Sequence, residues 1–98
     1  MVQDEAAVEK RLADEVKKAG GICFKFTSPG FAGVPDRIVL LPGASIAFVE
    51  AKAPGQKPRK LQVKVMSMIR ALGFRVEVVD SKEGAVQLVQ ELLGEAIE

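Results

Sequence analysis

Apolar residues recur along the chain at two spacings, and each spacing predicts its own kind of element. Helical spacing, with an apolar side chain every three or four residues, marks segments 4–18, 59–72 and 81 to about 93. Gly20–Gly21 and Gly73 end the first two segments, and Ser81 is positioned to cap the third. The expected inward stripes of the three helices are Val8, Leu12, Val16 and Ala19; Leu61, Val65, Met68 and Leu72; and Val86, Val89 and Leu93.

Short apolar runs bounded by Gly, Pro or Ser predict four strands, at 22–27, 37–41, 46–52 and 74–79. The turn at 42–45 makes the second and third strands a hairpin, and the loops before and after it are rich in Gly and Pro. The order αβββαβα predicts an α/β fold in which helices flank a mixed β-sheet. For 98 residues we expect one domain, spanning 1–98.

Composition excludes several kinds of chemistry. The chain has no His and no Tyr, which excludes Ser–His triads, His-containing zinc sites and tyrosine nucleophiles. It has no G-x-x-x-x-G-K-[ST] phosphate loop, and we expect no small-molecule cofactor. No apolar run approaches the roughly 20 residues that cross a bilayer, and the first ten residues lack the core of a signal peptide. The lone Cys23 fits a reducing cytoplasm, and its apolar neighbours indicate a strand rather than a reactive thiol.

Two acids and a lysine stand out near the open end of the hairpin. On strand 46–52, Glu50 and Lys52 follow apolar residues on one face and lie about 7 Å apart, although a simple ion pair would explain them equally well. A three-residue turn over 42–44 would pair Asp36 with Glu50 on that face. A two- or four-residue turn would separate them unless a bulge intervened. Converging carboxylates repel each other, and a hard cation such as Mg²⁺ or Mn²⁺ removes that penalty.

Three further polar residues are candidates, each with a plainer alternative. Glu9 falls on the apolar stripe of its helix, where a carboxylate is costly unless paired or metal-bound, or else the helix end frays into water. Gln62 flanks helix 59–72 and either orients a ligand near the first turn or bonds a backbone group. Lys25 either points inward from the first strand or is solvated.

The net charge is +1, but basic residues gather in segment 52–64, which contains no acid. Such a segment is able to meet phosphate, although a solvated loop and helix start would look the same. The residues expected to contact phosphate are Lys25, Lys57, Arg59, Lys60 and Lys64.

Three motifs in order carry a resemblance to a known family. The segment Gly33-Val34-Pro35-Asp36-Arg37, then Phe48-Val49-Glu50-Ala51-Lys52-Ala53-Pro54-Gly55, then Leu61-Gln62, resembles the VRR-NUC family of the PD-(D/E)XK nuclease superfamily. The similarity runs from about Glu5 to Val79 and looks like the minimal stand-alone form found in phages and bacteria. Ala51 departs from the larger aliphatic residue of many relatives, which affects packing more than chemistry.

The resemblance implies a restriction-endonuclease-like fold and hydrolysis of DNA phosphodiester bonds that depends on Mg²⁺ or Mn²⁺. Lys52 would hold or help activate the attacking water, and Gln62 would orient the substrate or Lys52. The groups implied around the metal are Glu9, Asp36, Glu50 and the carbonyl of Ala51.

Similar stand-alone members cut four-way (Holliday) junctions as dimers, so we expect a homodimer selective for branched DNA in a bacterial or phage-infected cell. Helix 59–72 and the loop before Asp36, which exposes Phe31, are candidates for the dimer surface. A flap nuclease, a nonspecific nuclease and a catalytically silent nucleic-acid-binding domain are the alternatives.

Overall fold

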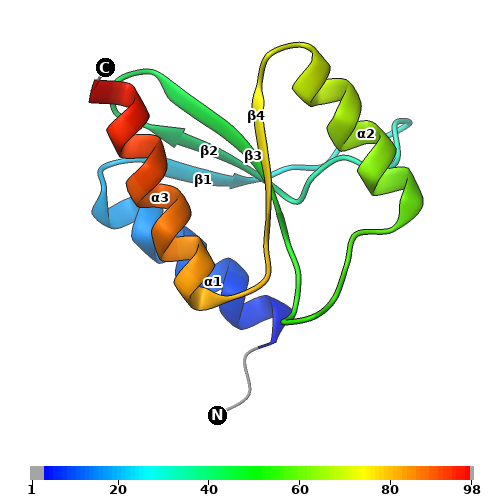
Figure 1. The fold of residues 1–98 in the computed structure, drawn as a ribbon, viewed down its shortest axis with the longest axis horizontal. Coiled ribbons are helices and arrows are strands. Elements are labelled where there is room, and N and C mark those ends of the chain that lie inside the picture. The colour runs from blue at the N-terminus through cyan, green and yellow to red at the C-terminus, as the bar shows by residue number, and fades with distance from the viewer. Residues whose placement is uncertain (1–3, 98) are drawn as a thin grey trace.

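The computed structural model describes residues 4–97 and has the predicted order of helices and strands (Figure 1). The elements are α1 (Glu5–Lys18), β1 (Ile22–Lys25), β2 (Arg37–Leu41), β3 (Ser45–Ala51), α2 (Lys60–Ala71), β4 (Arg75–Val79) and α3 (Lys82–Ile97). Within these residues no helix is both long and apolar enough to cross a membrane.

The sheet is mixed, as predicted, with the strand order β1-β2-β3-β4. β1 with β2 and β2 with β3 are antiparallel, and β3 with β4 is parallel. A parallel pair needs a crossover connection, and α2 supplies it between β3 and β4.

The turn between β2 and β3 has three residues, which confirms the register that the site requires. Leu41 pairs with Ser45, and Gly43 and Ala44 both have positive φ angles, 86° and 62°. At the other end of the hairpin Arg37 pairs with Val49. Continuing this register by one residue brings Asp36 opposite Glu50, on one face of the sheet.

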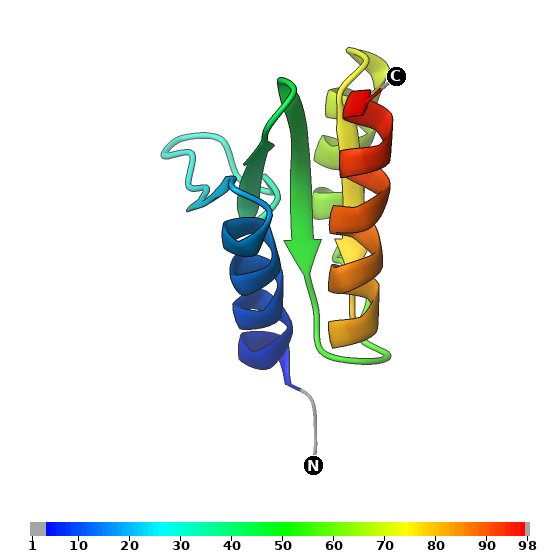
Figure 2. The ribbon, with the colours of Figure 1, turned by 90° about the vertical axis from the view of Figure 1, so that its left-hand side faces the viewer.

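Helices cover the two faces of the sheet unequally. α1 and α3 lie together on one face, and α2 lies on the other (Figures 1 and 2). The apolar core fills the α1/α3 face, and the predicted stripe of α1 is confirmed because Val8, Leu12 and Val16 are fully buried. On α3 the buried side is centred one residue away from the prediction. Its core residues are Ala85, Leu88, Val89 and Leu92, with Leu93 partly buried and Val86 half-buried.

The predicted stripe of α2 is wrong as a core-facing stripe. Val65 is buried, but Leu61 and Met68 are about half exposed, and Leu72 is 77% exposed. The helix instead turns Gln62, Val65 and Met66 toward the sheet, because the Gln62 amide donates a hydrogen bond to the buried Glu50 carboxylate. A row of apolar side chains on α2 is therefore left at the surface.

The ends of the elements differ slightly from the expected ones. β1 ends at Lys25 rather than at Thr27, although the Phe26 N–H still donates to the Asp36 carbonyl at 2.7 Å. The Ser81 cap is confirmed, since the Gly84 N–H donates to its hydroxyl at 2.9 Å. α3 continues to Ile97, beyond the expected end near Leu93.

Candidate active site

Asp36 and Glu50 are held together by two reciprocal hydrogen bonds. The Asp36 N–H donates to Oε1 of Glu50, and the Ala51 N–H donates to Oδ2 of Asp36, each at 3.2 Å. Each carboxylate is thus fixed by the backbone of the opposite strand. The buried Pro35 immediately before Asp36 anchors the start of this strand.

Lys52 completes this centre at the end of β3. Its ammonium lies 3.1 Å from Oε2 of Glu50, and its side chain is 15% exposed, while that of Glu50 is 1% exposed. The strand geometry continues through Lys52, whose N–H donates to the Val79 carbonyl at 2.9 Å. This confirms that the two alternate residues point into the same space.

Gln62 approaches Glu50 from α2. Its Nε2 donates to Oε2 of Glu50 at 3.0 Å, and its Oε1 accepts from the Arg59 N–H at 2.9 Å. The backbone bond that was the plainer alternative is therefore present together with the bond to the acidic centre. Because both ends of the amide are engaged, Gln62 is a rigid link between the start of α2 and Glu50.

Both carboxyl groups have raised pKa values. Burial raises the pKa of Glu50, and its bond to Lys52 and the charge of Asp36 act in opposite directions on that pKa. Burial also raises the pKa of Asp36, against the bond from the Ala51 N–H, while the charge of Glu9 raises it further. The pair is therefore an unfavourable concentration of negative charge that an added cation would relieve.

Glu9 lies close enough to influence Asp36 but is bonded elsewhere. Nε of Arg37 donates to its Oε1 at 3.2 Å, and each of the two side chains is 20% exposed. The expected inward direction of Glu9 is confirmed, and its ion pair with Arg37 offsets the free-energy cost of burying the carboxylate. Among residues 4–97 no cluster of three acidic, cysteine or histidine side chains is arranged to hold a metal, so Glu9 as a metal ligand stays a prediction.

The donor set nevertheless fits a hard divalent cation. Asp36 and Glu50 present carboxylate oxygens from adjacent strands, and the Ala51 carbonyl, whose role as a ligand stays a prediction, belongs to the same strand end. Carboxylate and carbonyl oxygens are the ligands that Mg²⁺ and Mn²⁺ prefer.

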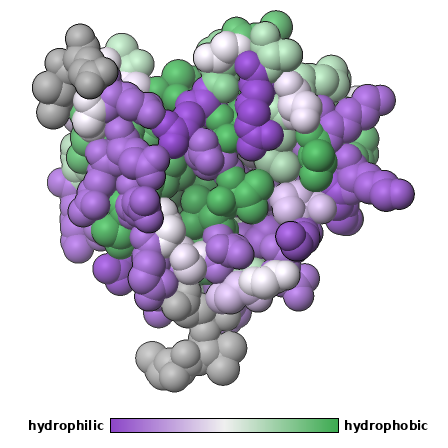
Figure 3. All heavy atoms as spheres, viewed as in Figure 1, coloured by the Kyte–Doolittle hydropathy of each residue, from purple (hydrophilic) through white to green (hydrophobic). Residues whose placement is uncertain are grey.

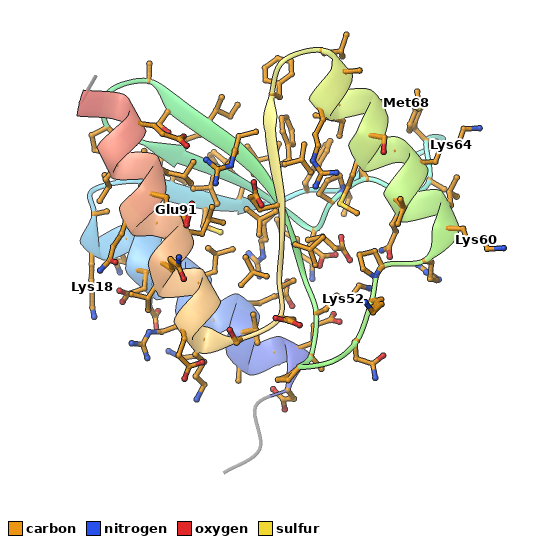
Figure 4. The ribbon with its side chains drawn as sticks, in the orientation of Figure 1. Lys18, Lys52, Lys60, Lys64, Met68 and Glu91 are labelled. Carbon is orange, nitrogen blue, oxygen red and sulfur yellow. The ribbon has the colours of Figure 1, made fainter. Side chains whose placement is uncertain are left out.

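The basic residues of segment 52–64 follow the centre along the chain, in the loop after β3 and on α2. Lys57, Arg59, Lys60 and Lys64 are exposed, and Lys60 and Lys64 extend from α2 away from the sheet (Figure 4). Lys25 is exposed at the end of β1, so its inward direction is wrong. Contact of these residues with DNA stays a prediction.

Cys23 is half-buried against the core, as its apolar neighbours indicated. Burial raises the pKa of its thiol, and the nearby Arg37 partly opposes this effect. A thiol with a raised pKa is a poor nucleophile, which agrees with the absence of a reactive role in the sequence prediction.

An apolar groove of about 310 Å³ runs between α2 and the sheet on the same face as Glu50. Its floor is an aromatic row in which the ring of Phe48 lies 5.9 Å from that of Phe26 and 5.8 Å from that of Phe74. Figure 3 shows apolar side chains reaching the surface in the middle of the molecule. The sequence prediction missed this groove because it assigned the α2 stripe to the core.

Arg37 is the charged residue near the centre that the sequence prediction left without a role. It belongs to the Gly33–Arg37 motif, and strand alternation places its side chain on the face opposite to that of Asp36. That alternation, together with the inward Glu9, is the signal that could have identified it.

Comparison with known proteins places this geometry among nucleases. Residues 3–83 match the family model of the VRR-NUC domain. The chain is 52% identical over 79 residues to p44, a candidate nuclease of Acyrthosiphon pisum secondary endosymbiont phage 1, a match that covers 81% of this chain and 85% of the phage protein. It is also similar to a solved VRR-NUC domain, with a TM-score of 0.77 and 32% identity over 92% of this chain and 94% of the other.

Proposed function

Because the chain belongs to the VRR-NUC domain family and is therefore a nuclease that acts on DNA, we propose that it is a metal-dependent endonuclease with Asp36, Glu50 and Lys52 at its catalytic centre. The observation that carries this proposal is the hydrogen-bonded convergence of two carboxylates and one ammonium at one end of the sheet. The raised pKa values of both acids support it, since perturbed groups concentrate at functional sites.

We propose Mg²⁺ or Mn²⁺ as the cofactor. The carboxylates of Asp36 and Glu50 would hold it, with Glu9 and the Ala51 carbonyl as further oxygen ligands. When bound, such a cation supplies Lewis acidity, which polarises a phosphate oxygen and makes water more acidic.

Lys52 is suited to hold the attacking water or a phosphate oxygen. An ammonium has three donors, so its bond to Glu50 leaves others available. Its low exposure and fixed partner reduce the freedom that must be lost when the substrate binds. Gln62 acts on Lys52 indirectly: it fixes the Glu50 carboxylate, and that carboxylate orients Lys52.

The exposed basic residues Lys57, Arg59, Lys60 and Lys64, together with Lys25, would bind the phosphates that flank the cut bond. Affinity for DNA should therefore fall steeply as salt rises. A chain that acts on DNA would work in the cytoplasm of a bacterial or phage-infected cell, and residues 1–98 would form a single nuclease domain.

Nicking of supercoiled plasmid tests the catalytic proposal. Mg²⁺ or Mn²⁺ should support nicking, Ca²⁺ should support binding without turnover, and EDTA should abolish activity. Full activity in excess EDTA would contradict metal dependence. Binding to DNA without nicking under any metal would favour the alternative of a silent nucleic-acid-binding domain.

For the substrate, we propose branched DNA, cut by a homodimer. One active centre makes one nick, and resolution of a four-way junction needs two nicks related by symmetry, which a two-fold dimer supplies. A panel of duplex, flap, splayed and four-way substrates tests this choice. Preference for a flap, or equal cutting of all four, would favour the flap or nonspecific alternative.

The apolar α2 face supports the homodimer, because it exposes more apolar surface than a small monomer usually does. The register of the strands puts Ile22, Phe24 and Ile46 on this same face of the sheet. At roughly 200 Å² per large apolar side chain, about half exposed, the group leaves on the order of 800 Å², as one partner of a stable dimer does. The group consists of Ile22, Phe24, Phe31, Ile46, Leu61, Met68, Leu72 and Phe74.

The α2 stripe also suggests how two copies would pack. The exposed members of the stripe, Leu61, Met68 and Leu72, lie seven and four residues apart, which is the spacing of one side of a helix–helix seam. In an antiparallel pair, Leu61 of one copy would meet Leu72 of the other. Lys60 and Lys64 of the two copies would then lie at opposite ends, where they do not repel each other. Light scattering of the wild-type protein at micromolar concentration is the direct test, and a mass near 10.5 kDa would refute the dimer.

A further inference from the structure

Arg37 and Glu9 form an ion pair beside the acidic centre, on the side of the sheet that α1 covers. Nε of Arg37 donates to Oε1 of Glu9 at 3.2 Å, and both side chains are four-fifths buried. The two residues come from elements that are distant in the sequence, α1 and the first position of β2. The bond thus ties the helix that carries Glu9 to the strand that begins directly after Asp36.

Strand alternation explains why the adjacent residues Asp36 and Arg37 point to opposite faces of the sheet. Asp36 turns toward Glu50, while the next residue, Arg37, turns to the α1 face, where it pairs in register with Lys25 and Val49. Any shift of Arg37 would therefore also be felt at Asp36.

The charges of Glu9 and Arg37 both act on Asp36, and with opposite signs. Glu9 raises the pKa of Asp36 and Arg37 lowers it, after the larger effect of burial. Three acids near one another would repel and spread apart. A guanidinium bonded to one of them offsets that repulsion and keeps Glu9 close to Asp36.

The bond uses one oxygen of Glu9 and so does not itself occupy Oε2. We propose that Arg37 is a positioning residue: it holds the Glu9 carboxylate in place beside Asp36, so that the affinity of the centre for a divalent cation depends on Arg37. This inference rests on the proposed function, because it takes Glu9 to be an oxygen ligand of that cation.

Binding of Mn²⁺ to the DNA-free protein, measured by calorimetry, tests this role without using activity. Arg37→Gln should weaken Mn²⁺ binding about tenfold, the lower end of the loss seen when a group that orients a ligand is removed. Arg37→Lys should restore most of the affinity, because a lysine can supply one donor to Glu9. In a Glu9→Gln background, Arg37→Gln should cause no further loss, since the two residues act through one contact.

Arg75→Gln is the matched control. Arg75 is an arginine on the same face of the sheet, paired with Glu77, Glu91 and Glu95 rather than with the acidic centre. It should lower thermal stability and leave Mn²⁺ affinity unchanged.

Three outcomes would overturn the inference. If Arg37→Gln lowers thermal stability but leaves Mn²⁺ affinity at the wild-type value, the ion pair is structural. If it weakens DNA binding in Ca²⁺ while Mn²⁺ affinity is unchanged, Arg37 is a phosphate contact. If the wild-type protein binds no Mn²⁺ at all, the metal-dependent function and this inference fail together, whereas in the first two cases the proposed function survives.

Discussion

The two faces of the sheet differ in what they bury: one buries an apolar core, and the other buries a charged group. On the α1/α3 face, Val39, Ala47 and Val49 are fully buried against two helices, and the interior is apolar. On the α2 face, the next residue of β3 after Phe48 that points to this face is Glu50, which is as buried as those core residues but charged. The same strand, β3, thus contributes to a stabilising core with one set of alternate residues and to a reactive centre with the other.

This difference separates stability from chemistry within a very small protein. Burial of apolar area on the α1/α3 face supplies the free energy of folding. The α2 face holds a carboxylate in a costly environment and leaves apolar side chains uncovered, and neither feature favours folding of the isolated chain. Substitutions on the two faces should therefore differ in what they change, and the following predictions begin with the largest expected effect.

Lys52→Ala should reduce cleavage about a thousandfold, in the range seen when one preorganised donor to a transition state is lost. The fold should be retained because the apolar core face is untouched, although the melting temperature should fall somewhat, since the buried Glu50 carboxylate loses one partner. Single-turnover nicking is the measurement. Lys57→Ala, in the same basic segment but exposed, is the control and should weaken DNA binding while cleavage at saturation is retained. A near-wild-type rate for Lys52→Ala would remove Lys52 from the mechanism.

Leu12→Ala should lower the free energy of unfolding by about 3 kcal/mol, because it opens a cavity in the packed α1/α3 face. Urea denaturation at several protein concentrations measures this loss, which should be the same at each concentration. A loss that grows on dilution would mean that Leu12 acts through assembly, and the proposed division between the faces would fail.

Gln62→Leu should lower the free energy of unfolding by about 2 kcal/mol at neutral pH, since it removes a donor from the buried Glu50 carboxylate. It should also slow cleavage, because Lys52 loses the rigid carboxylate that orients it. Ser67→Ala, on the exposed side of the same helix, controls for changes in helix propensity. Equal stability of Gln62→Leu and the control would show that the amide is dispensable to Glu50.

Met68→Glu should weaken the proposed dimer at least about tenfold, because it places a charge in an apolar seam. Val63→Glu is the matched control: Val63 is an equally exposed apolar residue on another side of the same helix. Sedimentation over a dilution series should show dissociation for Met68→Glu and not for Val63→Glu. Identical behaviour of the two variants would place the dimer surface elsewhere.

The smallest predicted effect is a pH dependence of the metal-free protein. The folded-state pKa values of Asp36 and Glu50 lie above their ordinary values of 3.8 and 4.5, so folding favours the protonated forms. Their contribution to stability is therefore greatest below those ordinary values and is lost as pH rises through the raised ones.

Asp36→Asn isolates this contribution, because it keeps an acceptor for the Ala51 N–H but cannot ionise. Its stability relative to wild type should increase from acidic to neutral pH, and Mn²⁺ should reduce the difference by stabilising the wild type. Thermal melts across this pH range measure it. A relative stability of Asp36→Asn that falls as pH rises would reverse the predicted sign.

Local patterns in the sequence determined most of the secondary structure and the acidic pair. The α1 stripe predicted the helix and its buried side, because helical periodicity and burial agree at Val8, Leu12 and Val16. Asp36, Glu50 and Lys52 could be grouped because strand alternation and a tight hairpin leave few registers, although the three-residue turn had to be assumed. Sequence also identified Glu9 as inward, but it could not identify Arg37 as its partner.

The tertiary structure alone decided which side of α2 faces the sheet. Leu61, Val65, Met68 and Leu72 form a more apolar stripe than the side that faces the sheet, which shares Val65 with this stripe but also includes Gln62, and periodicity therefore favoured the stripe. The helix instead turns Gln62 toward the sheet, where its amide donates to the buried Glu50. A buried carboxylate without a hydrogen-bond partner costs more free energy than an exposed leucine. Apolar spacing along a chain records which side chains avoid water, but it does not record whether the surface that covers them belongs to the same molecule.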